Sequence, residues 1–473
     1  MGNRGYWYTF SGALAAAALL VASQSWADHG GPSGEEGPYV PPAPEPVPPR
    51  HGQYWKVPDR YAHEVWLVDQ SNSPGLAHGG RIFIYDDEAL RRNAATAVPA
   101  VLDLGAATSA LCLAETGVNP VRPHMLVFNN TDTHAALAFV ASGHVVIFDA
   151  ATRTPLRCFR TEVGAGGARQ AHAVWPAPDD SFLLVANQNG KKFERIATNY
   201  STNTFVQEPT ATLDLANCTT PNGVACQHAE LRPDNAPICP FVPDSGFPAY
   251  VSLRGGGMFA VDPYSTPMSI VAEYDNEHIP RDGCGFMQAK NFIFGNGGGG
   301  NPANPDGWFL YRLPDEPAAY HPANLPNTPQ PFVLARDLRG PRDAHGVAVT
   351  KPDKYVYFFD RAANVVEIYK PASGEYVKTE SLVSPFSADP TPDLAGEAPD
   401  GKYVYLSLRG PLPLSGDPHA STGSTPGLLV LEILKDGRDV AVRGLAPISN
   451  IDSAGVERAD GHGIRVRRVN CTH

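Results

Sequence analysis

The sequence predicts an all-β protein, a seven-bladed β-propeller closed by pairing of the C-terminal strand with the N-terminal blade. Three observations predict this fold. Gly and Pro are abundant (45 and 46 residues) and charged residues make up only 18% of the chain, which is typical of many short strands joined by turns. A strand-rich unit recurs along the chain, and each end of the chain carries part of one further unit.

Residues 1–27 are predicted to be a signal peptide. Arg4 precedes the apolar run FSGALAAAALLVA, and the segment SQSWA places the small residues Ser25 and Ala27 before a cleavage site. Cleavage after Ala27 would make the protein periplasmic or secreted, and the Ala-rich run is typical of bacterial signals. No later run approaches the roughly 20 apolar residues that span a bilayer, so we expect no membrane anchor.

Residues 28–52, DHGGPSGEEGPYVPPAPEPVPPRHG, are rich in Pro, Gly and acidic residues. Such a segment has almost nothing to bury, so we predict a disordered leader. The propeller is then expected to occupy residues 53–473.

Six copies of the repeating unit begin at residues 124, 172, 228, 284, 345 and 393. Each opens with His or a substitute for it, continues into an apolar strand and often a "PD" turn, and then enters a second strand rich in Val, Tyr and Phe. The clearest copies are HAVWPAPDDSFLLVANQNG, HGVAVTKPDKYVYFFDRAANVVEIYK and DLAGEAPDGKYVYLSLRG. The spacing of the copies suits four-stranded blades with insertions.

The two ends of the chain supply the seventh unit. The segment EVWLVDQSNSPGLAHGGRIFIYD (64–86) has second and third strands without a first, and GHGIRVRRV (461–469) has a first strand with nothing after it. Pairing between these segments would close the array into a ring and remove its exposed sheet edges.

The copies that begin at His345 and Asp393 resemble the repeats of the YVTN or YncE-like seven-bladed β-propellers of bacteria. The resemblance covers roughly residues 53–473 and implies a periplasmic propeller. The chain departs from the family pattern in long insertions after His228 and at 296–307 and 411–427. Loops of this length often carry binding sites.

One strand-entry position holds a metal-binding residue in every unit. Five of the seven residues are His, although His makes up only 15 of the 473 residues. Because the innermost strands of a propeller surround one axis, we predict a site for Zn or Cu at the mouth of the channel, with three or four ligands from adjacent blades. The predicted ligands are His124, His172, His228, His345, His462, Cys284 and Asp393.

Three aspartates precede ring residues by two positions and are predicted to orient the imidazoles: Asp282, Asp343 and Asp460. Alternatively, they cap the turn that enters the strand. The ring itself also has a structural interpretation, in which its histidines bind the backbone of neighbouring blades and Cys284 forms a disulfide with Cys239. Cys218 and Cys226 suit a local disulfide, and the pairing of the remaining cysteines stays open.

Three functions agree with these features. The first is carriage or storage of the metal, since the His-led repeats are similar to those of zinc-metallochaperone propellers. The second is a metal-dependent periplasmic enzyme, either an oxidoreductase related in architecture to copper propellers or a lactonase-like hydrolase that uses a ring histidine as general base. The third is a non-catalytic scaffold for a protein or glycan.

Other ligands and partners are not expected. The net charge of −12 and the lack of a Lys/Arg block argue against nucleic acid. There is no C-x-x-C-H motif for haem, and the glycine run 297–300 lacks the Lys and Ser/Thr of a nucleotide-binding loop. The expected partners are a metal ion or small molecule at the channel mouth and a periplasmic protein.

Overall fold

The computed structural model describes residues 61–280, 283–298, 308–337, 342–414 and 422–470. All of them belong to one compact unit, residues 46–473. The predicted signal peptide (1–27) and leader (28–52) lie outside the described residues, so these boundaries and the start of the propeller at residue 53 stay predictions. No helix among the described residues is long and apolar enough to cross a membrane.

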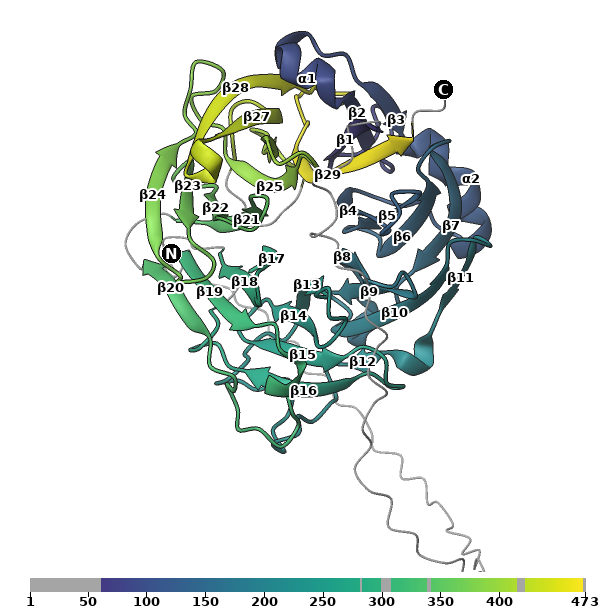
Figure 1. The fold of residues 1–473 in the computed structure, drawn as a ribbon. Helices are drawn as coiled ribbons and strands as arrows, with labels where there is room; N and C mark the ends of the chain where they lie inside the picture. Colours follow the sequence, from purple (N-terminus) through teal and green to yellow (C-terminus); the bar gives the residue numbers. More distant parts are fainter. Residues whose placement is uncertain (1–60, 281–282, 299–307, 338–341, 415–421, 471–473) are drawn as a thin grey trace, which may run out of the picture. The chain divides into compact units, whose positions relative to one another are not determined.

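Seven antiparallel sheets surround a central axis, which confirms the predicted seven-bladed propeller (Figure 1). Each sheet runs from an innermost to an outermost strand. The first three blades consist of β29 (Gly461–Asn470), β1 (Tyr61–Asp69), β2 (Arg81–Asp86) and β3 (Ala100–Asp103); β4 (Pro123–Phe128), β5 (His134–Phe139), β6 (His144–Asp149) and β7 (Thr154–Arg160); and β8 (Ala171–Pro176), β9 (Phe182–Asn187), β10 (Lys192–Asn199) and β11 (Thr204–Gln207), with β12 (Leu213–Asp214) paired to β10.

The other four blades follow in chain order. They consist of β13 (Pro237–Phe241), β14 (Ala249–Leu253), β15 (Met258–Asp262) and β16 (Ser269–Tyr274); β17 (Phe286–Ala289), β18 (Phe292–Gly297), β19 (Trp308–Pro314) and β20 (Phe332–Asp337); β21 (Ala344–Val349), β22 (Val356–Asp360), β23 (Val365–Tyr369) and β24 (Tyr376–Ser381); and β25 (Pro392–Glu397), β26 (Tyr403–Leu408), β27 (Gly427–Leu434) and β28 (Asp439–Pro447).

In four blades a tight hairpin turn joins the first and second strands, and three of these turns contain the "PD" dipeptide. One residue of each turn adopts a left-handed conformation, Asp132, Asp180, Asp353 or Gly401, with φ between 54° and 70°. Asp and Gly tolerate this conformation better than most residues. The turn residues therefore help to set the register of these four hairpins.

The C-terminal strand closes the ring, as the sequence predicts. Strand β29 pairs antiparallel with β1, and Val466 lies opposite Val65 in the register. Figure 1 shows the yellow C-terminal strand beside the purple N-terminal strands. The first blade is thus built from both ends of the described chain.

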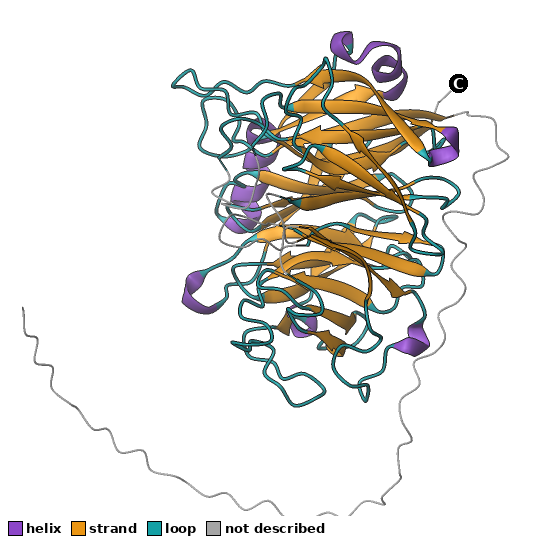
Figure 2. Cartoon of the chain, turned by 90° about the vertical axis from the view of Figure 1, so that its left-hand side faces the viewer, coloured by secondary structure: helices purple, strands orange, loops and turns teal. Residues whose placement is uncertain are grey.

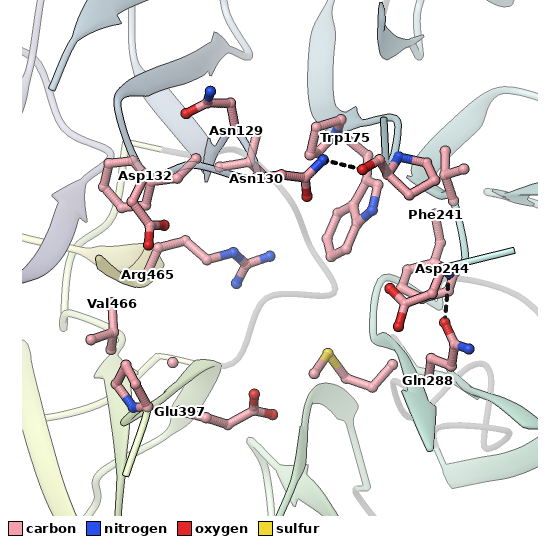
Figure 3. Close-up of a pocket in the computed structure, with 18 of the residues that line it drawn as sticks. Asn129, Asn130, Asp132, Trp175, Phe241, Asp244, Gln288, Glu397, Arg465 and Val466 are labelled. Carbon is pink, nitrogen blue, oxygen red and sulfur yellow. Dashed lines mark hydrogen bonds between the residues drawn. The ribbon is translucent and has the colours of Figure 1, made fainter. Parts of the chain in front are cut away.

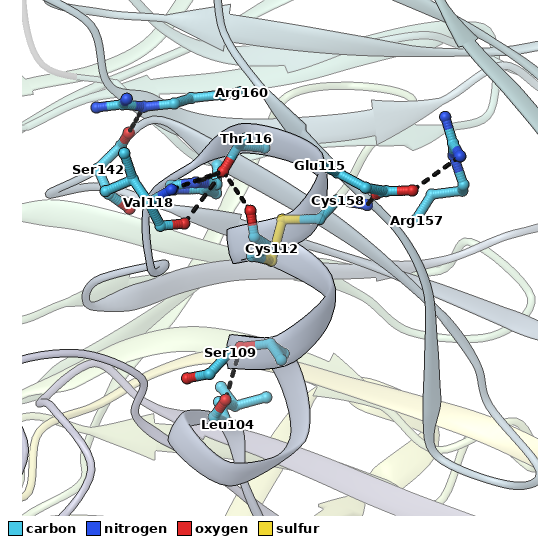
Figure 4. Close-up of a disulfide and its surroundings, with 12 residues drawn as sticks. Leu104, Ser109, Cys112, Glu115, Thr116, Val118, Ser142, Arg157, Cys158 and Arg160 are labelled. Carbon is cyan, nitrogen blue, oxygen red and sulfur yellow. Dashed lines mark hydrogen bonds and ion pairs between the residues drawn. A yellow bond between two sulfur atoms is a disulfide. The ribbon is translucent and has the colours of Figure 1, made fainter.

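Helices lie around the outside of the strands (Figure 2). They are α1 (Asp87–Asn93), α2 (Leu104–Thr116) and the single 3-10 turns η1 (Ala94–Thr96), η2 (Ala165–Gly167), η3 (Pro209–Ala211), η4 (Pro317–Ala319) and η5 (Lys435–Gly437). Helix α2 packs against β7, and the Cys112–Cys158 disulfide joins the two elements (Figure 4). The helix therefore covers the outer edge strand of the second blade.

Two more disulfides lie in the described chain, Cys218–Cys226 and Cys239–Cys284. The sequence predicts the first pair as a local disulfide and the second only in the structural interpretation of the ring, whereas Cys112–Cys158 was left open. Three disulfides indicate folding in an oxidising compartment.

We expect the Cys112–Cys158 disulfide to stabilise the fold more than the Cys218–Cys226 disulfide does. The two bonds close loops with sequence separations of 46 and 8 residues, and a longer loop loses more entropy in the unfolded chain when it is closed. The variant C112S/C158S should lose about 4 kcal/mol of unfolding free energy, and C218S/C226S about 2.5 kcal/mol. Urea unfolding followed by circular dichroism measures both, and equal losses would contradict the prediction.

Candidate functional site

The candidate site lies on the propeller axis, where a β-bulge turns one residue out of the regular pairing in the innermost strands of six blades. In β21, for example, Ala344 pairs with Asp360 and Val347 with Phe358, so His345 and Gly346 together face Phe359. A bulge of this kind re-aims a side chain. Equivalent register shifts occur in β4, β8, β13, β25 and at the start of β29.

The bulged residues of six blades, together with Cys284 just before β17 in the fifth blade, form an axial ring with one residue from each blade. In chain order from the first blade, its members are His462, His124, His172, Ile238, Cys284, His345 and Asp393. Six of these are residues that the sequence predicts. The equivalence predicted for His228 is wrong, because Pro237–Phe241, and not the segment after His228, forms the innermost strand of the fourth blade.

His228 lies instead in a loop, where it forms an isolated bridge with Arg232. Its Nδ1 accepts hydrogen bonds from the backbone N–H groups of Glu230 and Leu231, both at 3.3 Å. Cys284 is in the ring, but its sulfur is bonded to Cys239. His228 therefore lies outside the axial ring, and Cys284 is in the ring but bonded through its sulfur.

The remaining five ring residues form a continuous arc in the order His345, Asp393, His462, His124, His172. The imidazole ring of His124 lies 3.6 Å from that of His462 and 4.6 Å from that of His172, measured between ring centres. On the other side, Nε2 of His345 lies 3.2 Å from Oδ1 of Asp393, and Nε2 of His462 lies 3.7 Å from Oδ2. Except for His172, which is half-buried, these side chains are buried.

Glycine after the ring residue lets adjacent inner strands approach closely. A Cβ atom on Gly463 would lie 2.4 Å from the carbonyl oxygen of His124, and one on Gly346 would lie 2.5 Å from that of Asp393. Both distances are shorter than a real contact allows. The crowding explains why the ring residues of neighbouring blades can touch one another.

A chain of hydrogen bonds determines the tautomer of His124. Asp460 accepts a hydrogen bond from the amide Nε2 of Gln70 at 2.7 Å, and this leaves Oε1 of Gln70 facing Nδ1 of His124 at 2.9 Å. Because that oxygen only accepts, Nδ1 of His124 carries the proton. Its Nε2 is then a lone-pair donor, and it has no hydrogen-bond partner among the described residues.

His172 is held in the same way. Its Nδ1 lies 3.0 Å from the backbone carbonyl oxygen of Ile238, which can only accept. In the neutral form of His172, the lone pair would therefore lie on Nε2. A metal-binding histidine normally donates its other N–H to a fixed acceptor, and both His124 and His172 satisfy this requirement.

Two buried arginines surround the carboxylate of Asp393. Nη1 of Arg361 donates to Oδ1 of Asp393 at 3.0 Å, and Nη1 of Arg409 lies 3.4 Å from Oδ2. The sequence analysis did not identify either arginine. Their position in the repeat could have identified them, because both arginines directly follow the second strand of a blade. Gln70 occupies the same position in the first blade.

Two of the predicted orienting aspartates, Asp343 and Asp460, bind these arginines. Asp343 accepts from Nε and Nη2 of Arg361 at 2.9 and 3.0 Å, and Asp460 accepts from Nε and Nη2 of Arg409 at 2.7 and 2.9 Å. Asp460 reaches His124 only through Gln70. Asp282 lies outside the described residues.

Burial dominates the protonation of the ring. It holds the pKa of His124, His345 and His462 well below the ordinary value, and the neighbouring imidazoles and arginines act in the same direction. Burial also raises the pKa of Asp393 to about 6, although Arg409 and Arg361 oppose this. Near neutral pH the ring thus presents neutral imidazoles at His124, His345 and His462 and one carboxylate at Asp393.

Comparisons with known proteins agree with the fold. No protein-family model matches the chain, and a comparison with curated proteins also found no match. Among solved structures, a hypothetical selenium-binding protein of Sulfolobus tokodaii is similar with a TM-score of 0.57 and 10% identity, over 87% of this chain and 94% of that chain. A proposed 6-phosphogluconolactonase of Bacteroides uniformis is similar with a TM-score of 0.52 and 12% identity, over 87% and 100%. At these identities the likenesses show the fold alone.

We expect the buried histidines to make the fold sensitive to acid. Below the ordinary histidine pKa of about 6.5, the unfolded chain takes up protons that the folded ring does not, so stability falls as the pH falls. Each such histidine steepens the pH dependence by up to about 1.4 kcal/mol per pH unit. Urea unfolding between pH 7 and pH 5 should therefore show a shallower dependence for H124Q/H462Q than for the wild type.

Comparing the pH dependence of stability in the wild type and in H124Q/H462Q isolates the contribution of these two imidazoles. Asp393 acts in the opposite direction, because its raised pKa removes stability as the pH rises toward 6, and it is present in both proteins. The variant H228Q/H321Q also loses two histidines but leaves the ring intact, so it is the matched control. A slope for H124Q/H462Q equal to that of the wild type would contradict the prediction.

Proposed function

We propose that the axial ring binds one transition-metal ion, Zn or Cu, and that the protein carries or stores this ion. The observation that carries the proposal is the arc of four imidazoles and one carboxylate on the axis. Ligand atoms of His345, Asp393 and His462 all lie within 4.8 Å of one another. Imidazole with a carboxylate is a donor set that suits Zn and Cu.

The donor atoms fit such an ion because several of them lack another partner. Among the described residues, Nε2 of His124, Nδ1 of His462 and both ring nitrogens of His345 are buried without a hydrogen bond. Buried polar atoms normally have a partner, and an ion would supply one. Their neutral state removes the need to displace protons when a metal binds.

The surrounding charges favour binding of a cation at the end of the arc formed by His124 and His172. Asp343, Asp393 and Asp460 contribute three negative charges when ionised, and Arg361 and Arg409 contribute two positive ones. The arginines lie against Asp393, so they repel a cation there more strongly than at His124 and His172. We therefore expect His124, His172 and His462 to contribute most to metal binding.

Export to the periplasm through the predicted signal peptide is part of the proposal. The three disulfides support it, as does the resemblance of the repeats to YVTN or YncE-like propellers. A second candidate function, a hydrolase, has one supporting observation: the 3.2 Å contact between His345 and Asp393 resembles the pair of a general base and its orienting carboxylate. Either function would use the ring.

Metal analysis tests the proposal. Full-length protein purified without an affinity tag should contain or take up about one equivalent of Zn or Cu, measured by elemental analysis and by titration against a competing chelator. The variant H124Q/H462Q should lose this binding, because two adjacent donors are removed.

The control for this experiment is H228Q/H321Q, which removes two histidines outside the ring and should bind metal like the wild type. Circular dichroism verifies that each variant is folded. Less than about one tenth of an equivalent in the wild type, with no uptake on titration, would overturn the proposal. So would equal binding by the wild type and a folded H124Q/H462Q variant.

A further inference from the structure

A second set of equivalent residues faces the axis farther along the inner strands. Each member follows the ring residue of its blade by three positions, which corresponds to about 10 Å of strand. The set consists of Val127, Trp175, Phe241, Met287, Ala348, Gly396 and Arg465. All but Ala348 line a cavity of about 270 Å³ on the axis.

The size difference around this set creates the cavity. Trp175, Phe241 and Met287 are large and come from consecutive blades, whereas Ala348 and Gly396 are the smallest members and come from the next two. Trp175 and Phe241 lie with their ring centres 5.1 Å apart and form an apolar wall. Figure 3 shows the Arg465 side chain extending into the cavity toward this wall.

Arg465 is one of three cationic residues that line the cavity, with Lys351 and Arg468. Its Nη1 donates to the backbone carbonyl oxygens of Ile464 and Ala395 at 3.0 and 3.5 Å, and its guanidinium lies 5.3 Å from the ring centre of Trp175. Among the described residues it forms no ion pair, and its Nε and Nη2 have no acceptor. Burial lowers the pKa of Arg465, although Glu397 opposes this.

Five other charged residues line the cavity: Asp132, Asp244, Lys351, Glu397 and Arg468. Lys351 donates to the backbone carbonyl oxygen of Pro399 at 3.1 Å. Arg468 pairs with Asp132 at 2.9 Å. Glu397 accepts a hydrogen bond from the backbone N–H of Val349 at 2.6 Å. Arg465 therefore offers two hydrogen-bond donors, Nε and Nη2, beside an aromatic wall.

We propose that this cavity binds a small aromatic carboxylate, whose carboxylate pairs with Arg465 and whose ring packs against Trp175 and Phe241. A guanidinium recognises a carboxylate with two parallel hydrogen bonds, and Nε with Nη2 provides such a pair of donors. An apolar cavity of about 150 Å³ is enough for benzene, so the space here suits one aromatic ring with its carboxylate. The site is separate from the ring histidines and does not depend on metal binding.

The test is calorimetric titration of the full-length protein with phenylacetate, benzylamine and benzyl alcohol, which share one ring and differ in charge. We expect phenylacetate to bind most tightly. The variant R465M keeps the length of the side chain and removes its charge, so it should weaken phenylacetate binding by about tenfold to hundredfold.

A second variant tests the cavity itself. A Cβ atom on Gly396 would meet its nearest neighbours at 3.4 to 3.7 Å, which is ordinary contact, so G396L should fold and fill the cavity. It should abolish phenylacetate binding. R443M, which removes an arginine of the outermost strand β28 that pairs with Glu432 and does not line the cavity, and H124Q/H462Q, which changes only the metal ring, should bind phenylacetate like the wild type.

Three results would overturn this inference. One is no binding of phenylacetate at millimolar concentration. The others are equal affinity in the wild type and a folded R465M variant, and binding of benzylamine as tight as that of phenylacetate. Because H124Q/H462Q separates the two sites, a failure here leaves the metal proposal untouched, and the reverse also holds.

Discussion

Pairing of β29 with β1 is the constraint on which the axial site depends. A propeller blade cannot bury its faces alone, and an open array would expose unpaired edges at both ends. By supplying the innermost strand of the first blade, β29 places His462 between Asp393 and His124. Closure therefore also completes the arc of ring residues.

Burial of charge is the second constraint on the ring. Removing a carboxylate from water is costly unless hydrogen bonds and opposite charges compensate it. Arg361 and Arg409 provide this compensation by bridging Asp393 to Asp343 and Asp460. Since a buried ion pair often adds little net stability, its main contribution here is a defined geometry around Asp393.

One strand connects the two sites proposed on the axis. His462 and Arg465 both belong to β29, and the bulge near its start aims the first of them into the ring. The ring is lined by polar groups that suit a cation, whereas the cavity combines an aromatic wall with a guanidinium. The same seven strands thus present different chemistry at two depths, because each depth collects its own set of equivalent residues.

Much of the fold could be predicted from the sequence, because the same pattern of turns and apolar strands occurs in several repeats along the chain. The ring residues His124, His172, His345, His462 and Asp393 could be found for the same reason. The repeat pattern predicted the wrong ring residue in the fourth blade, where an insertion separates His228 from the inner strand β13. The actual ring residue, Ile238, is identified by its position at a bulge, and no residue type marks a bulge in the sequence.

Only the tertiary structure decided which residues touch. Cys239 and Cys284 belong to neighbouring blades, and Gln70, Arg361 and Arg409 reach the ring from second strands. Sequence alone established the circular repeat and its histidines, since local patterns determine strands and turns. Packing alone determines the distances between strands that are far apart in the chain. These distances decide which residues contact the ring, that Cys284 forms a disulfide, and that a cavity lies beside Arg465.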